Sequence, residues 1–134
     1  MRIDGACHCG RVSFEADVDP ERVTICHCTD CQALTGTAYR VSVSTDREAF
    51  RLTGAAPKLY VKAAESGRPR SQFFCPDCGS PIYTTGVGAD AERVGIRWGT
   101  IRQRDLLRPT KRIWERSEPD WVEHIGALPA SPEE

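Results

Sequence analysis

Apolar and polar residues alternate along several short stretches of the chain. The clearest are residues 11–18 (RVSFEADV), 39–44 (YRVSVS) and 93–98 (RVGIRW), in which every second side chain is apolar. A period of two is typical of a strand that buries one side and exposes the other. The pattern therefore predicts three half-buried strands.

Shorter β-rich runs lie between these strands, separated by Gly, Pro, Asp or Ser at intervals of roughly ten residues. They are residues 49–54, 58–62, 71–74, 81–85 and 111–115. Helical signals are weak, since residues 29–36 and 102–107 each have room for only a turn or two. The sequence predicts a mainly β fold with minimal helix.

Length and charge limit the possibilities further. A chain of 134 residues with 40% hydrophobic content fits one domain with one core. We expect this domain to span residues 1–126, with a flexible tail at 127–134. A net charge of -1 gives no strong field, so neither nucleic acid nor a membrane is expected as a partner. No stretch has the character of a signal peptide or a membrane span, which predicts a cytoplasmic protein.

Seven cysteines are the most informative residues of the chain. The cytoplasm keeps thiols reduced, so this number in a short chain points to metal binding or catalysis rather than to disulfides. The cysteines fall into three groups with metal-ligand spacing: Cys7 and Cys9; Cys26, Cys28 and Cys31; Cys75 and Cys78.

The segment CPDCG, residues 75–79, is typical of a zinc knuckle, in which a tight turn presents two thiolates to one ion. Structural zinc takes four ligands, and alternate residues of an extended segment share a side, so Cys7 and Cys9 can supply the other two. One zinc with three spare thiols is an alternative. An iron–sulfur or thiolate-bridged cluster is another, although the spacings match neither ferredoxin pattern.

The remaining triple, Cys26, Cys28 and Cys31, needs only one short turn to converge on its own ion. Zinc with three protein ligands and an open position is typical of catalysis. An anionic three-thiolate site suits a substrate thiol as the fourth ligand, held as thiolate near neutral pH. His8 and His27 should point away from the metal, but His27 or Asp30 could carry a proton beside the open site.

Four segments of the chain, in order, carry a resemblance to a known family. They are GACHCGRVSFE, CHCTDCQALTGTAYR, FFCPDCGSPIY and GTIRQRDLLRPTKRIWERSEPDWV. They resemble the glutathione-dependent formaldehyde-activating and centromere protein V family over nearly the whole chain. The resemblance implies coiled antiparallel sheets similar to those of Mss4-like zinc proteins, and two zinc ions per chain. It implies a structural ion on Cys7, Cys9, Cys75 and Cys78, and a catalytic ion on Cys26, Cys28 and Cys31.

The activity that this resemblance implies is a carbon–sulfur lyase reaction between glutathione and formaldehyde. The expected partners are thus a small thiol and a small aldehyde, whose adduct is formed or broken at the open zinc. Lys62, Arg68 and Arg70 could bind carboxylates of such a thiol, or form an ordinary hairpin tip. A zinc-stabilised binding module and a thiol redox or metal sensor are the alternative functions.

Overall fold

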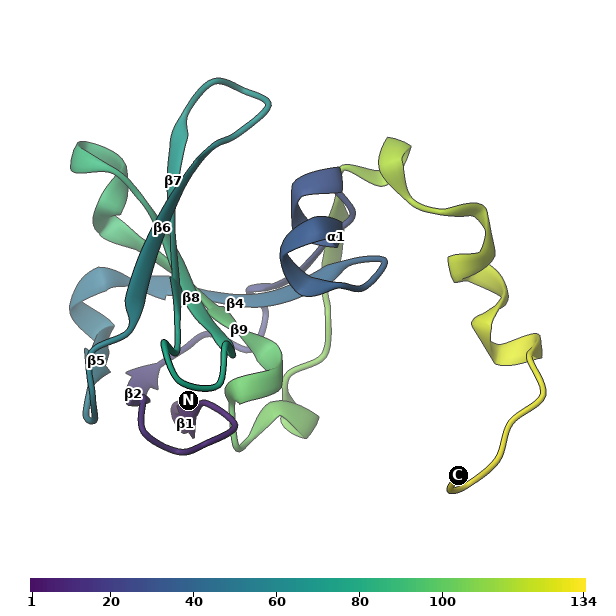
Figure 1. Ribbon diagram of the computed structural model, residues 1–134, viewed down its shortest axis with the longest axis horizontal. Coiled ribbons are helices and arrows are strands. Elements are labelled where there is room, and N and C mark those ends of the chain that lie inside the picture. The colour runs from purple at the N-terminus through teal and green to yellow at the C-terminus, as the bar shows by residue number, and fades with distance from the viewer.

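Ten strands in two sheets form the body of the computed structural model, which describes residues 1–134 (Figure 1). The smaller sheet has three antiparallel strands in the order β1-β2-β5. In its middle strand, buried Phe14 and Ala16 alternate with more exposed polar residues, as the period of two predicts. The strands are β1 (Arg2–Ala6), β2 (Ser13–Asp17) and β5 (Phe50–Leu52).

The larger sheet has seven strands in the order β10-β3-β4-β9-β8-β7-β6. Every neighbouring pair is antiparallel except β10 with β3, which is parallel. The strands are β3 (Val23–Cys26), β4 (Arg40–Asp46), β6 (Lys58–Ala63), β7 (Pro69–Phe74), β8 (Pro81–Gly86), β9 (Arg93–Arg97) and β10 (Lys111–Ile113).

One α-helix, α1 (Thr29–Thr35), follows β3 directly. Its N-cap is Cys28, and it ends at Gly36, whose φ of 68° places it in the left-handed region where glycine is favoured. The other helical segments are short 3-10 turns. They are η1 (Arg47–Ala49), η2 (Gly88–Glu92), η3 (Trp98–Thr100), η4 (Arg104–Leu106), η5 (Glu115–Ser117) and η6 (Asp120–Ala127).

Both sheets contribute their apolar sides to one core. Val43 of β4 faces Ile96 of β9 in the register, and both are fully buried with Phe14 of the smaller sheet. The opposite side of the larger sheet is polar, because the residues that alternate with this core set are arginine, serine, threonine and glutamine. They include Arg40, Ser42, Gln72, Thr84 and Arg97.

The mainly β fold class is confirmed, and each predicted strand overlaps a strand of the structure. β1 and β3 were not predicted, because RIDGA contains only one large apolar residue and VTIC lies directly before the cysteine segment without a polar boundary. The expected helix at residues 102–107 is a single 3-10 turn. The division of the chain at residue 126 stays a prediction, and no helix has the length and hydropathy that crossing a bilayer requires.

Candidate metal centres

Four cysteines from two distant parts of the chain converge at one end of the smaller sheet. The sulfur atoms of Cys7, Cys9, Cys75 and Cys78 all lie within 4.8 Å of one another. Two of the separations are 3.5 Å, between Cys7 and Cys9, and 3.7 Å, between Cys9 and Cys75. A zinc ion with four sulfurs at about 2.3 Å has tetrahedral edges of about 3.8 Å. This donor set therefore fits zinc in size and in ligand chemistry.

Two matching turns build this cluster. The amide of Gly10 donates to the carbonyl of Cys7 at 3.0 Å, and that of Gly79 donates to the carbonyl of Cys75 at 2.9 Å. Both glycines have positive φ, 83° and 79°, which a residue with a Cβ rarely adopts. Each turn folds the chain back so that its cysteines face the same point.

Ser80 connects the two turns. Its hydroxyl accepts a hydrogen bond from the backbone N–H of His8 at 3.0 Å and lies 3.2 Å from the sulfur of Cys78. Hydrogen bonds from Ser80 lower the pKa of the Cys78 thiol to about 5, which favours the thiolate that a metal ion binds.

The other three cysteines form a second cluster where β3 ends and α1 begins. The sulfurs of Cys26, Cys28 and Cys31 lie within 4.8 Å of one another, and no histidine, aspartate or glutamate completes the group. The backbone N–H of Cys31 donates to the sulfur of Cys28 at 3.3 Å. A hydrogen bond from Cys31 lowers the pKa of Cys26, while the pKa of Cys31 itself is raised by that bond and by burial. Three soft donors with one open side also fit zinc.

A strap formed by residues 111–118, hereafter the C-terminal strap, passes alongside this second cluster (Figure 1). Its strand β10 places Ile113 beside Cys26 in the register, and the carbonyl of Ile113 accepts the backbone N–H of His27 at 3.1 Å. The side-chain amide of Gln32 donates to the carbonyls of His27 at 2.9 Å and Ser117 at 3.0 Å. The strap, α1 and the cysteine turn are thus held as one unit.

The two predicted proton carriers have different surroundings. The ring of His27 is only 2% exposed, packs edge-on against Tyr39, and lies 3.9 Å from the carboxylate of Glu118. Asp30 is in the first turn of α1 and is half-exposed, and its carboxylate accepts a hydrogen bond from the Lys62 ammonium at 3.0 Å. The proton-transfer role of either residue stays a prediction.

Comparison with known proteins decides the family. The family model described as "Glutathione-dependent formaldehyde-activating enzyme" (GFA) matches residues 2–117. The chain belongs to the GFA family. The resemblance to the GFA family that the four sequence segments indicate is thereby confirmed.

One curated protein and one solved structure are similar to this GFA family member. A Halomonas elongata protein named "Putative glutathione-dependent formaldehyde-activating enzyme" is 27% identical, over 92% of this chain and 81% of that protein. A crystal structure of a Rhodobacter sphaeroides protein matches with a TM-score of 0.62 and 19% identity, covering 81% of this chain and 98% of that one. The second likeness supports the fold alone.

Of three hollows of the GFA chain, one contains a residue of the three-cysteine cluster. That hollow, of about 770 Å³, is lined by Cys28, Asp30, Lys62 and residues of the C-terminal strap. Two others, of about 490 Å³ and 450 Å³, share Arg40 and Arg97 in their walls. Neither arginine was among the site residues predicted from the sequence. The alternation in residues 39–44 and 93–98 places them on the polar side of their strands, but it does not show that this side is buried.

Two of the predicted substrate-binding residues lie outside these hollows. Arg68 is exposed in the turn between β6 and β7, whereas Arg70 is half-buried on β7, and burial lowers its pKa. Neither lines any of the three hollows, in contrast to Lys62.

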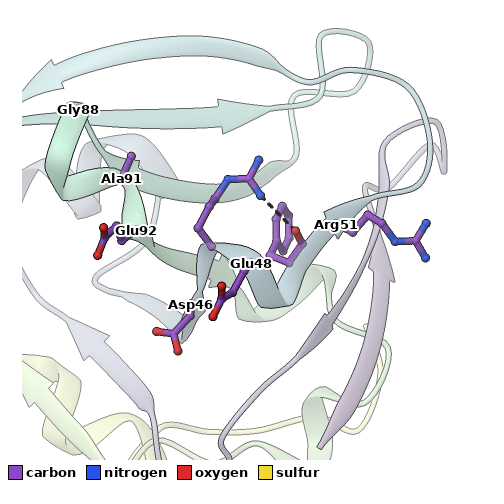
Figure 2. A pocket seen from close by; sticks show the side chains of 8 residues that line it. Asp46, Glu48, Arg51, Gly88, Ala91 and Glu92 are labelled. Atoms are coloured by element: carbon purple, nitrogen blue, oxygen red, sulfur yellow. Dashed lines mark hydrogen bonds between the residues drawn. The ribbon is translucent and has the colours of Figure 1, made fainter.

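Another hollow, of about 790 Å³, contains no cysteine (Figure 2). Figure 2 shows the side chains of Asp46, Glu48 and Arg51 around it, with the carboxylates pointing away from Arg51. None of the predicted site residues lines it. A group of exposed acidic and basic side chains without a soft ligand gives it no connection to the thiol chemistry.

Proposed function

We propose that this chain forms or breaks adducts between a small thiol of the glutathione type and a small aldehyde of the formaldehyde type. This is a carbon–sulfur lyase reaction. The observation that carries the proposal is the convergence of three thiols, Cys26, Cys28 and Cys31, with no fourth side-chain ligand. Membership of the GFA family and the name of the H. elongata relative support glutathione and formaldehyde as the substrate types.

The proposal assigns different tasks to two zinc ions. The ion on Cys7, Cys9, Cys75 and Cys78 would be closed by four sulfurs and structural. Zinc held by Cys26, Cys28 and Cys31 would supply Lewis acidity that lowers the pKa of a substrate thiol near neutral pH.

The chain's own residues then position the reactants and move protons. In the synthetic direction the substrate sulfur forms a bond to the carbonyl carbon, the C=O π pair moves to the oxygen, and the oxygen takes up a proton. Asp30, half-exposed in the lining of the hollow that contains Cys28, would accept the thiol proton. His27 with Glu118 is the second candidate for proton transfer. Lys62, and more remotely Arg68 and Arg70, would attract the carboxylates of the thiol.

The test is a Cys28→Ser variant with two measurements, the zinc content per chain and adduct formation from glutathione and formaldehyde followed by NMR. The parent should hold two ions, and the variant should lose one of them together with more than about 99% of the rate, because hydroxyls bind zinc poorly. Thr29→Ser, a change in the lining of the same hollow, is the matched control and should keep both. A parent with a single ion, or a variant that keeps activity, would show that the cluster is not the reactive site.

A further inference from the structure

Two buried arginines occupy the polar side of the larger sheet next to the three-cysteine cluster. Arg40 and Arg97 are only 5% and 9% exposed. Arg40 is the register partner of Cys26, so their side chains leave neighbouring strands on the same side. Arg97 of β9 is the register partner of Ser42, which lies two residues after Arg40 on β4. Both guanidinium groups therefore lie in the immediate surroundings of the thiols.

The hydrogen bonds of this pair are made only to neutral groups. The side-chain carbonyl oxygen of Gln72 accepts from Arg40 at 3.1 Å and from Arg97 at 2.7 Å, and the Ser42 hydroxyl accepts from Arg97 at 2.7 Å. No carboxylate forms an ion pair with either arginine. The Nε of Arg40 is buried and has no hydrogen-bond partner at all.

The positive charges of Arg40 and Arg97 have no acidic side chain to balance them. Buried charges are normally paired, because a charged group without a partner loses its hydration and gains little in return. Burial lowers the pKa of Arg97 well below its ordinary value, and the positive charge of Arg40 lowers it further. A zinc ion with three thiolates carries one net negative charge, whereas the two arginines carry two positive charges. Before a substrate thiolate binds, one positive charge is thus left without a counter-charge.

Space for a small anion exists at this point. Arg40 and Arg97 form the wall shared by the hollows of about 490 Å³ and 450 Å³. Aromatic side chains contribute to both hollows, Tyr39 and Trp98 to one and Tyr60 and Phe73 to the other, and the second also contains Lys58. A concave apolar site with a few convergent polar groups is the usual form of a small-molecule site. Guanidinium groups match the planar, two-oxygen geometry of a carboxylate.

We propose that Arg40 and Arg97 bind a carboxylate of the thiol substrate, so that the site selects small thiols that carry a carboxylate over neutral ones. The thiol part of this statement rests on the proposed function, whereas the carboxylate part rests only on the arginines. No cysteine lines the two hollows themselves, but Arg40 is the register partner of Cys26. A carboxylate on the arginines would therefore leave the thiol of a short molecule on the side of the sheet that carries Cys26.

Three probes separate the two parts: 3-mercaptopropionate has both groups, 2-mercaptoethanol has only the thiol, and propionate has only the carboxylate. Binding to the zinc-loaded protein is measured by calorimetry, and adduct formation with formaldehyde by NMR. We expect 3-mercaptopropionate to bind at least about tenfold more tightly than 2-mercaptoethanol, as a charge-assisted contact implies. Propionate should compete with 3-mercaptopropionate and not with 2-mercaptoethanol.

Arg97→Gln should bring the two thiols to within about twofold of each other and abolish propionate binding. Arg97→Lys, which keeps the charge and loses the two-pronged geometry, should keep part of the preference. If Arg97→Gln does not fold, Arg40→Gln makes the same test on the other arginine. The matched control is Arg93→Gln, on the same strand, where the side chain is exposed and paired with Asp46 at 3.3 Å. This variant should behave as the parent does.

The outcomes distinguish the two proposals. Equal affinity of the parent for both thiols, or an unchanged preference in a folded Arg97→Gln, would overturn the arginine site and show that the pair only balances the charge of the thiolates. Propionate binding that depends on Arg97, without adduct formation from either thiol, would support the arginine site and overturn the proposed function.

Discussion

The two cysteine clusters are built in opposite ways. The four-cysteine cluster joins the end of β1 to the turn between β7 and β8, which are far apart in the sequence. The three-cysteine cluster comes from the single segment 26–31, which strand pairing on both sides of β3 and the bonds of Gln32 already hold. An ion that closes a long loop restricts the unfolded chain far more than one that closes a short turn. The first cluster can therefore stabilise the fold, whereas the second is free to serve chemistry.

The electrical surroundings of the two clusters also differ. Next to the four-cysteine cluster the charged neighbours are Arg11 and Asp77, an exposed pair at 3.1 Å that is neutral as a whole. Next to the three-cysteine cluster Asp30 and Lys62 form a similar pair, but Arg40 and Arg97 are buried and have no acidic partner. In the first cluster four thiolates complete the coordination of zinc, whereas in the second three thiolates leave one position for a ligand. The two arginines give the surroundings of the second cluster a positive potential, which attracts an anion.

The largest expected effect is that of Cys75→Ser in the four-cysteine cluster. The Cys75 side chain is 0% exposed, and a hydroxyl there would bind zinc poorly. Losing a structural ion costs on the order of 5 kcal/mol or more, which is comparable to the whole stability of a small domain. Circular dichroism should show a largely unfolded variant or a greatly lowered melting temperature. Cys31→Ser in the other cluster should keep the fold, and equal destabilisation by both changes would contradict the division of roles.

A chelator should remove zinc from the two clusters at different rates. Stepwise addition to the zinc-loaded protein is expected to remove the ion of the three-cysteine cluster first, because it has one fewer protein ligand and lies beside an open hollow. A zinc indicator should show two phases, at least about tenfold apart in rate. The circular dichroism signal should change only in the second phase. A single phase accompanied by unfolding would indicate that both ions are structural.

Disrupting the contacts around each cluster gives smaller effects that sharpen the comparison. Gln32→Ala removes two hydrogen bonds that join α1 to His27 and to the C-terminal strap, at a cost of about 1–2 kcal/mol. Amide hydrogen exchange should show the N–H of His27, which donates to Ile113, losing protection.

The matched control for that change is Gln103→Ala. Its side chain makes two hydrogen bonds with Asp4 of β1, at 2.7 and 3.1 Å, on the side of the molecule that carries the four-cysteine cluster. It should cost a similar free energy of unfolding and leave the exchange of His27 unchanged. Equal loss of protection in both variants would show that the strap is not a local unit.

The sequence predicted most of the strands and the three-cysteine group because both are local patterns. The alternation in residues 39–44 can be recognised without knowing which strands pair with it. The spacing of Cys26, Cys28 and Cys31 lets the three thiols converge within one turn. That Cys7 and Cys9 meet Cys75 and Cys78 required an argument about ligand number, which the geometry of the cluster now satisfies.

The surroundings of the open site could not be predicted in the same way. Burial of Arg40 and Arg97 depends on what covers the polar side of the sheet, and this is set by α1 and the strand order rather than by the alternation. The parallel pairing of β10 with β3 likewise joins two segments that are far apart in the sequence. No pattern of apolar and polar residues reports such a pairing. Long-range partners of a polar side chain are thus the information that one sequence lacks.

The smallest effect concerns a single hydroxyl at the four-cysteine cluster. Hydrogen bonds from Ser80 lower the pKa of Cys78 to about 5, so the thiolate is present at neutral pH and is protonated only as the pH falls through that value. Ser80→Ala should raise this pKa, and protons should then displace zinc at a higher pH than in the parent. Acid titration with a zinc indicator should show the later phase of release moving upward by less than about one pH unit. Ser66→Ala, in the exposed turn after β6, should leave both phases in place, and an unchanged titration of Ser80→Ala would mean that the other three sulfurs alone set the affinity.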